Sequence, residues 1–143
     1  MASANGLISA VIIGNLGADP EMRYTPGGHA VTNFRMAVNQ RVPLPRAQGQ
    51  EETQWDAKAQ WFKVSVWGKQ AEACNMYLKK GSKVAVEIER FNFDLDTGAP
   101  VLFTRQDGTA GANYEVTART VRFLDSLPEG QGAPPQEEVI PFN

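Results

Sequence analysis

The chain has 143 residues, 42% of them hydrophobic, and a formal net charge of −2 at pH 7. This length suits a single domain with a core of ordinary size, and no apolar run approaches the roughly 20 residues of a membrane span. One histidine and one cysteine are too few for a structural zinc site, and we expect no metal site.

The charge is spread unevenly along the chain. All 14 Lys and Arg residues lie in residues 1–126, together with 13 of the 16 Asp and Glu residues, so this part carries a net charge of +1. Residues 127–143 hold the other three acids and no basic residue. A near-neutral body can carry a local basic groove, so the negative total does not exclude a nucleic-acid partner.

The N-terminal residues, MASANGLISAV, place no basic residue before the apolar stretch and are a poor match to a signal or transit peptide. The single cysteine, Cys74, excludes an intramolecular disulfide and fits a reducing compartment. We therefore expect a cytoplasmic protein that does not associate with a membrane.

The pattern predicts three strands in the first half of the chain. LISAVIIGNL, residues 7–16, is rich in β-branched and aliphatic residues and predicts the first strand. Turn signals around a short extended piece at residues 22–25 lead to a second, alternating strand over residues 30–41. Residues 42–59 contain two prolines and little periodicity, so we expect a long loop there before the third strand, residues 60–69.

The second half predicts one helix and two more strands. Residues 68–81 predict the helix, because two lysines and a glycine suit its C-terminal end. A fourth strand begins at residue 82, and a hairpin excursion over residues 96–113 separates it from a fifth strand, residues 114–124. The helix would turn three residues toward the core: Ala71, Cys74 and Leu78.

Five strands with one helix between the third and the fourth is the chain order of the OB fold, a small, partly open all-β barrel. We assign residues 1–126 to this domain. Residues 127–143 contain four of the nine prolines and no sustained periodicity, so we expect a flexible, disordered acidic tail with an apolar tip.

The third strand, QWFKVSVWGK, has an unusual second face. Phenylalanine and valine at its even positions predict a core face, so alternation places Trp61, Lys63 and Trp67 on the other side, beside Arg35 of the second strand. Burial of both faces is one interpretation, but a dry contact would desolvate these charges. Aromatic rings interleaved with cations suit single-stranded nucleic acid, whose bases stack on the rings while its phosphates meet the cations.

Two further features lie around the predicted end of the fourth strand. Phe91 and Phe93 would extend the aromatic surface, with a hairpin mini-core as the alternative. Asp94 and Asp96, in FDLDTG, could indicate a metal-dependent nuclease, although alternate carboxylates before Thr-Gly fit a turn with solvated acids better.

Residues 136–143, QEEVIPFN, join acids to an apolar cluster. A frayed terminus is one interpretation, but exposed apolar residues in a flexible segment suit capture by a partner's apolar pocket with a basic rim. The residues that we assign to partner binding are Glu137, Glu138, Ile140, Pro141 and Phe142.

Four segments carry a resemblance to a known family: VIIGNLGADPEMRYTPGGHAVTNF (11–34), WFKVSVWGKQAE (61–72), YLKKGSKVAVE (77–87) and EVTARTVRFLD (115–125). In these segments the sequence resembles the bacterial single-stranded DNA-binding proteins. The resemblance implies an OB-fold domain, usually assembled as a homotetramer, that wraps single-stranded DNA without sequence preference and uses no cofactor. It also implies a nucleoid-associated protein whose acidic tail recruits replication and repair proteins.

The resemblance implies roles for individual residues. Trp61 and Trp67 match stacking positions of the family, Trp67 where phenylalanine is common, and Phe91 or Phe93 lies near a hairpin aromatic. An aromatic that usually follows the second strand is absent here, and Trp55 is the candidate to replace it. Residues that match basic, DNA-contacting positions are Arg23, Lys69 and Lys80. The tail departs from the family pattern, with only two adjacent acids and with Asn143 after Phe142.

The sequence therefore predicts a non-enzymatic protein that binds single-stranded DNA by base stacking and phosphate neutralisation. The predicted stacking residues are Trp55, Trp61, Trp67, Phe91 and Phe93, and the predicted phosphate contacts are Arg23, Arg35, Lys63, Lys69 and Lys80. Two alternatives stay open at this point. One is an interaction module that only bridges proteins, and the other is a small nuclease that uses Asp94 and Asp96.

Overall fold

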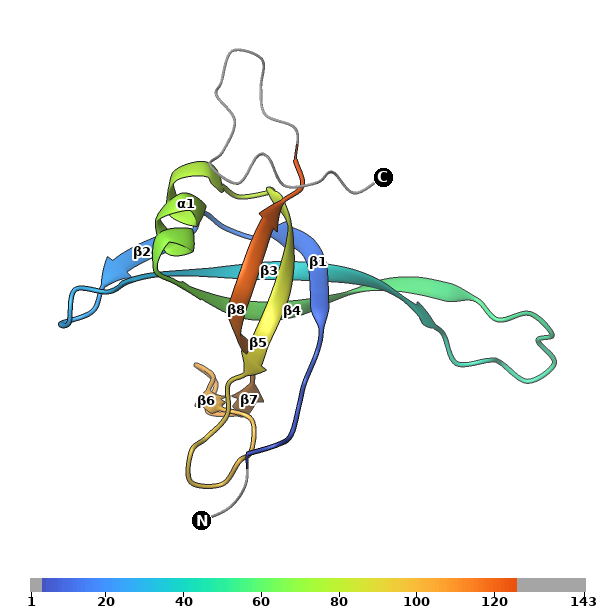
Figure 1. The fold of residues 1–143 in the computed structure, drawn as a ribbon. Helices are drawn as coiled ribbons and strands as arrows, with labels where there is room; N and C mark the ends of the chain where they lie inside the picture. The colour runs from blue at the N-terminus through green and yellow to red at the C-terminus, as the bar shows by residue number, and fades with distance from the viewer. Residues whose placement is uncertain (1–3, 126–143) are drawn as a thin grey trace.

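The computed structural model describes residues 4–125, which fold into strands and one short helix (Figure 1). In chain order the elements are β1 (Val11–Leu16), β2 (Glu21–Tyr24), β3 (Ala30–Pro43), β4 (Trp55–Trp67), α1 (Lys69–Tyr77), β5 (Lys83–Phe91), β6 (Leu102–Thr104), β7 (Ala110–Ala112) and β8 (Tyr114–Phe123). The predicted tail, with Glu137, Glu138, Ile140, Pro141 and Phe142, lies outside the described residues. Within residues 4–125, no helix is long and apolar enough to cross a membrane.

Five strands close into a barrel. The main sheet has the order β1-β5-β8-β4-β3-β2, and β1 also pairs with β3, so β1, β5, β8, β4 and β3 form a ring to which β2 adds at β3. Only the β4–β8 pair in this sheet of residues 4–125 is parallel. This arrangement confirms the predicted OB fold. Helix α1 lies at one end of the barrel and the small β6–β7 hairpin at the other (Figure 1).

Alternating side chains fill the barrel, because every second residue of each regular strand points inward. The buried core includes Phe34, Met36, Phe62, Val64, Val66, Val84, Val86, Ile88, Val116 and Val121. Cys74 of α1 and Leu78 complete the core at the helix end. Burial raises the pKa of the Cys74 thiol to about 12, because desolvation disfavours the thiolate.

Barrel closure depends on a close approach between β1 and β3. Asn15 and Leu16 pair with Ala37 and Met36, respectively. A Cβ atom at Gly14 would overlap the carbonyl oxygen of Ala37, which is a backbone atom and cannot rotate away. Glycine at this position therefore lets β1 cross β3 closely enough to close the ring.

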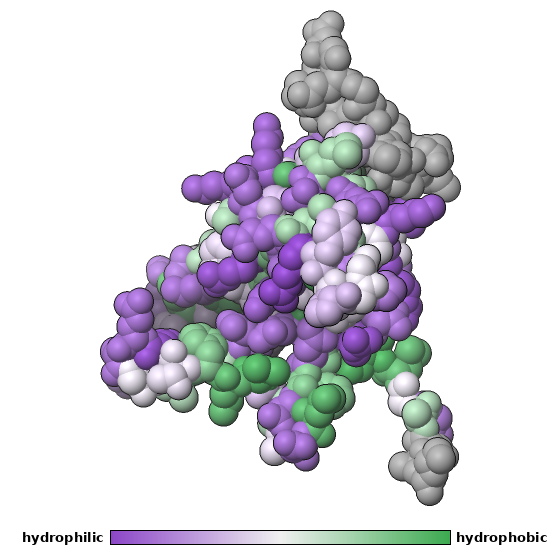
Figure 2. Space-filling model, turned by 90° about the vertical axis from the view of Figure 1, so that its left-hand side faces the viewer, coloured by the Kyte–Doolittle hydropathy of each residue, from purple (hydrophilic) through white to green (hydrophobic). Residues whose placement is uncertain are grey.

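The outer surface differs between the two ends of the barrel. Hydrophilic side chains predominate around α1, whereas hydrophobic side chains gather at the opposite end, where β6, β7 and the N-terminal segment lie (Figure 2). Large exposed hydrophobic residues in these segments and in the loop between β5 and β6 are Leu7, Ile8, Leu95, Leu102 and Phe103.

The helix is shorter than the sequence predicts. It ends at Tyr77, and Leu78 takes an extended conformation that buries its side chain in the core. Gly81 has a φ of 91°, and its N–H donates to a carbonyl of β1, which draws the chain back to the barrel. Lys79 and Lys80 therefore lie in the turn beyond the helix, and their predicted place in its last turn is wrong.

The predicted loop over residues 42–59 is wrong in its extent. β3 continues to Pro43 and β4 begins at Trp55, so only residues 44–54 form the loop. The added strand residues, such as those of Asp56-Ala57-Lys58-Ala59, are exposed on both faces. They show no apolar alternation because neither face of this part of the ladder covers a core.

Replacing Gly14 with alanine is expected to lower the free energy of unfolding by about 1–3 kcal/mol, because the backbone must move to relieve the overlap with Ala37. Urea unfolding followed by circular dichroism measures the change. Gly6→Ala is a matched control, since a Cβ there meets no atom within 4 Å, and it should change stability by less than about 0.5 kcal/mol. A Gly14→Ala protein as stable as the parent would contradict the close approach.

Candidate nucleic-acid interface

The outward face of β4 carries the side chains that alternation predicts. The even-numbered residues from 62 to 66 are buried, and the odd-numbered residues face away from the core. Trp61 and Trp67 are 43% and 48% exposed, and Lys63 between them is also exposed. Within residues 4–125, the two indoles are therefore open to solvent over almost half of their surface.

β3 adds a cation and a polar pair to the same face. Arg35 lies opposite Lys63, and its guanidinium carbon is 5.1 Å from the centre of the Trp61 ring, within cation–π range. Asn33 lies opposite Ser65, whose Oγ donates a 2.7 Å hydrogen bond to Asn33 Oδ1. The structure thus brings together the predicted residues Arg35, Trp61 and Lys63.

Gly17, which immediately follows β1, lies against the ring of Trp61. The N–H of Gly17 donates a 2.9 Å hydrogen bond to the carbonyl of Arg35. A Cβ atom at Gly17 would lie 2.5 Å from Cζ3 and 2.7 Å from Cη2 of Trp61, so the ring rests against the glycine backbone. Sequence reasoning missed this contact, because the segment GNLG, residues 14–17, indicates only a turn at the end of a strand.

Arg23 extends the face onto β2. It lies opposite Val31, which in turn lies opposite Trp67, so Arg23 and Trp67 occupy one row on the same side of the sheet. Two strand spacings, about 10 Å, separate their backbones. Lys69 begins α1 just after Gly68, whose φ of 74° turns the chain from β4 into the helix. Both basic residues are exposed.

Lys80 and Trp55, two further predicted residues, lie at separate places. Lys80 is exposed in the turn after α1, where its backbone N–H donates to Asp19 Oδ1 at 2.8 Å. Trp55 is the first residue of β4, opposite Pro43, rather than part of a loop. Its ring centre is 4.3 Å from the guanidinium carbon of Arg41, a partner that the predicted set does not include.

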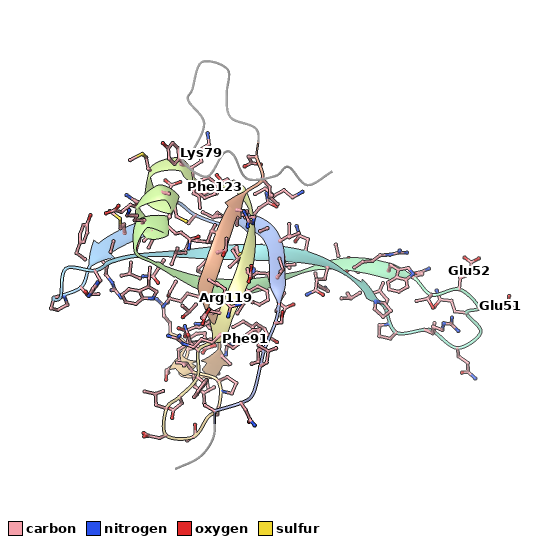
Figure 3. The ribbon with its side chains drawn as sticks, viewed as in Figure 1. Glu51, Glu52, Lys79, Phe91, Arg119 and Phe123 are labelled. Carbon is pink, nitrogen blue, oxygen red and sulfur yellow. The ribbon has the colours of Figure 1, made fainter. Side chains whose placement is uncertain are left out.

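Paired β-bulges change the direction of Phe91. The register between β5 and β8 shifts at Glu89 and at Arg119, each of which is an extra, unpaired residue. Arg119 Nε donates to Glu89 Oε2 at 2.5 Å, and this hydrogen bond holds the pKa of Glu89 below its ordinary value. Phe91 lies opposite Val116 and packs, half-buried, against the core (Figure 3). Simple alternation along the strand predicts Phe91 on the same outward face as Glu89, and this prediction is wrong because the bulges turn Phe91 toward the core.

Phe93 and Asp94 lie just beyond β5. Phe93 is 49% exposed. Asp94 Oδ1 accepts the backbone N–H groups of Thr97 and Asp96, which hold the pKa of Asp94 below its ordinary value. Asp94 is thus a turn residue, and within residues 4–125 no group of three or more His, Cys, Asp or Glu side chains is placed to hold a metal ion.

Comparison with known proteins gives consistent matches over most of the chain. The family model described as the single-strand binding protein family matches residues 7–124. The chain is 40% identical over 117 residues to a protein named single-stranded DNA-binding protein from Halalkalibacterium halodurans, covering 80% of this chain and 59% of that protein. It is 36% identical over 124 residues to single-stranded DNA-binding protein 3 from Listeria innocua, covering 85% and 66%.

A third similar protein, named single-stranded DNA-binding protein and found in Wolinella succinogenes, is 34% identical over 135 residues. That match covers 93% of this chain and 74% of the relative. The chain thus spans about three fifths to three quarters of the length of the three relatives it matches.

Gly17→Ala is expected to displace the Trp61 ring while leaving Trp67 in place, because the added Cβ would overlap only the Trp61 ring. In a variant with Trp55 and Trp67 replaced by phenylalanine, the Trp61 emission should shift to longer wavelength and become more accessible to iodide quenching. The matched reporter keeps Trp67 and replaces Trp55 and Trp61, and its emission should not change. An unchanged Trp61 emission would show that Gly17 does not set the ring position.

Proposed function

Because the chain belongs to the single-strand binding protein family, we propose that it binds single-stranded DNA with little preference for sequence. The observation that carries this proposal is the outward face of β3 and β4, where Trp61 and Trp67 lie among Arg35 and Lys63. The names of the relatives support the same ligand. The proposed role is binding, without catalysis.

Base stacking accounts for the tolerance of sequence. Every base has a π face, so an exposed indole can stack on any of them, and each stack contributes roughly 1–3 kcal/mol. Cations along the same face would neutralise phosphates and release counterions, so affinity should fall as salt rises. The proposed phosphate contacts are Arg23, Arg35, Lys63, Lys69 and Lys80, all of them exposed.

A dry protein contact explains this face less well. Arg35 and Lys63 form no ion pair within the described residues, so covering the face with an apolar surface would desolvate two unpaired charges. Such burial costs several kcal/mol for each ion. A wet, anionic ligand such as a DNA strand avoids this cost.

The other predicted aromatic residues differ in how much of the side chain is exposed to solvent. Trp55 and Phe93 are about half exposed, and we retain both as candidate stacking residues. Phe91 is half-buried against the core, so it would contribute less ring area than Phe93.

The wider role that we propose is protection of single strands during DNA replication, recombination and repair, at the nucleoid in the cytoplasm. Recruitment of replication and repair proteins would fall to the tail, through Glu137, Glu138, Ile140, Pro141 and Phe142. The support for this part is the acidic and apolar composition of residues 136–143 and the family membership.

We also propose that the chain assembles as a homo-oligomer, specifically a homotetramer. The support is an exposed apolar surface on and before β1, where the side chains are at least half exposed: Leu7, Ile8, Val11 and Ile13. Exposed apolar side chains of this kind suit a contact with a second copy.

Ile13→Glu is expected to lower the molecular mass in solution, because it places a charge in the proposed contact. Light scattering at matched protein concentration measures the mass. Met76→Glu is the matched control, since Met76 is an exposed apolar residue of α1, far along the chain from β1. A parent protein with the mass of one chain would refute the assembly, and an Ile13→Glu protein with the parent's oligomeric mass would place the contact elsewhere.

Replacing Trp61 and Trp67 with alanine is expected to weaken binding of oligo-dT by roughly 1–3 kcal/mol each, because each change removes one stacking ring. In the parent protein, oligo-dT should quench the tryptophan fluorescence, and anisotropy of a labelled oligonucleotide measures affinity in all variants. The fold should persist, since both side chains are substantially exposed.

Met76→Ala serves as the control for this series, because it removes an exposed apolar side chain outside the proposed face. No quenching of the parent at low salt would refute the stacking mechanism. Unfolding of both tryptophan variants would instead support burial of the indoles in an assembly.

A further inference from the structure

A row of polar residues crosses the outward face of β2, β3 and β4, and its central member is Asn33. Asn33 pairs with Glu21 of β2 on one side and with Ser65 of β4 on the other, so the three side chains point to the same side of the sheet. Asn33 and Ser65 are half-buried, whereas Glu21 is exposed. These three residues form the polar row, which contains no cation.

Cations lie on both sides of the polar row. Two residues away in one direction along the strands, Arg35 lies opposite Lys63. Two residues away in the other direction, Arg23 lies in line with Trp67 across β3. Neighbouring rows are about 7 Å apart, because a strand rises about 3.3 Å per residue. The carboxylate of Glu21 would repel phosphates from the polar row itself. The phosphates of a bound strand would therefore meet the flanking rows, and a base would lie across the polar row.

The polar row also lies between the two exposed indoles. Ser65 is two residues from Trp67 and four residues from Trp61 along β4. None of the three residues of the row is aromatic, so a base that lies there cannot stack on a ring of the row. Its polar edge atoms would instead meet side chains that form hydrogen bonds, which is how unpaired bases are distinguished from one another.

A hydrogen bond within the row orients the amide of Asn33. Ser65 Oγ donates to Asn33 Oδ1 at 2.7 Å, so the two side-chain oxygens face each other. Within residues 4–125, Asn33 Nδ2 donates no hydrogen bond, and no buried side-chain nitrogen or oxygen lacks a partner. The amide nitrogen is therefore open to solvent, with both of its hydrogens available to a ligand.

This orientation of the amide favours one class of base. An asparagine recognises adenine with both ends of its amide, because Oδ1 accepts from the N6 amino group while Nδ2 donates to N7. Ser65 engages Oδ1, so the nitrogen is the end that remains free at Asn33. Thymine offers carbonyl oxygens that accept such a donor, whereas adenine places an amino group beside N7. A donor presented alone therefore suits thymine better than adenine.

We propose that Asn33, oriented by Ser65, donates a hydrogen bond to a carbonyl oxygen of a bound base and makes the interface favour thymine over adenine. Ser65 acts as a positioning residue, since it works through the amide. The inference rests on the proposed binding of single-stranded DNA. It adds a modest preference for one class of base to a stacking mechanism that accepts every base.

Labelled oligo-dT and oligo-dA of about 12 nucleotides, compared by anisotropy in one buffer, test this preference. Self-stacking of the free oligo-dA strand affects every variant equally, so the informative quantity is the change in the ratio of the two affinities. Asn33→Ala should weaken binding of oligo-dT about three- to ten-fold, the loss expected for one hydrogen bond. It should change binding of oligo-dA less than about two-fold, because adenine does not use the amide nitrogen alone.

Ser65→Ala provides a second measurement that keeps Asn33 in place. It removes only the hydroxyl oxygen, so the fold should persist, which circular dichroism checks. The released amide can present both of its ends to adenine, so the preference for oligo-dT should fall at least about two-fold, chiefly through tighter binding of oligo-dA. Asn75→Ala is the matched control, since Asn75 is an exposed asparagine of α1 outside the outward face of β3 and β4. It should leave both affinities unchanged.

Two results would overturn the inference. An unchanged ratio in the Asn33→Ala protein would show that the amide does not distinguish the bases, whether the two affinities stay constant or fall together. An unchanged ratio in the Ser65→Ala protein would show that the hydrogen bond from Ser65 does not set the preference. Failure of the proposed function is distinguishable, because the parent protein would then bind neither homopolymer.

Discussion

The register between β3 and β4 is the constraint on which the core and the candidate interface both depend. Thirteen residue pairs join the two strands without a bulge. Because the side-chain period is two, a slip of one residue would turn Trp61, Lys63 and Trp67 into the barrel and expose the valines between them. The hydrophobic core therefore fixes the orientation of the candidate interface. The part of the β3–β4 ladder beyond the barrel, residues 39–43 and 55–59, keeps the same alternation of side chains.

Barrel closure connects β1 to the outward face of β3 and β4 through two glycines that make different contacts. Gly14 lets the backbone of β1 approach Ala37, and Gly17, three residues later, lies against the ring of Trp61. The hydrogen bond from Gly17 to the carbonyl of Arg35 joins the same turn to the cation beside that ring. The closed ring thus places Gly17 against the ring of Trp61, the proposed stacking residue, before any ligand binds, and this contact would reduce the entropy lost on binding.

Sequence alternation could predict the barrel strands and the Trp61–Lys63–Trp67 face, because both follow from a two-residue period over a buried core. It could not predict that β3 continues to Pro43 and that β4 begins at Trp55, since strand residues that cover no core show no apolar period. The bulges at Glu89 and Arg119 reverse the alternation within a strand, and only the pairing of β5 with β8 reveals that Phe91 turns inward. The contact of Gly17 with Trp61 joins residues 44 positions apart, so no local pattern could indicate it.

The burial of Cys74 has a practical consequence for labelling chemistry. It is the chain's single cysteine, and its thiol is enclosed in the core with a pKa raised to about 12, so it offers almost no thiolate to a maleimide at neutral pH. A cysteine introduced on the surface, for example Gln54→Cys at the base of the loop, would be the one reactive thiol. A fluorophore or spin label could then be attached at a chosen position without altering the native core.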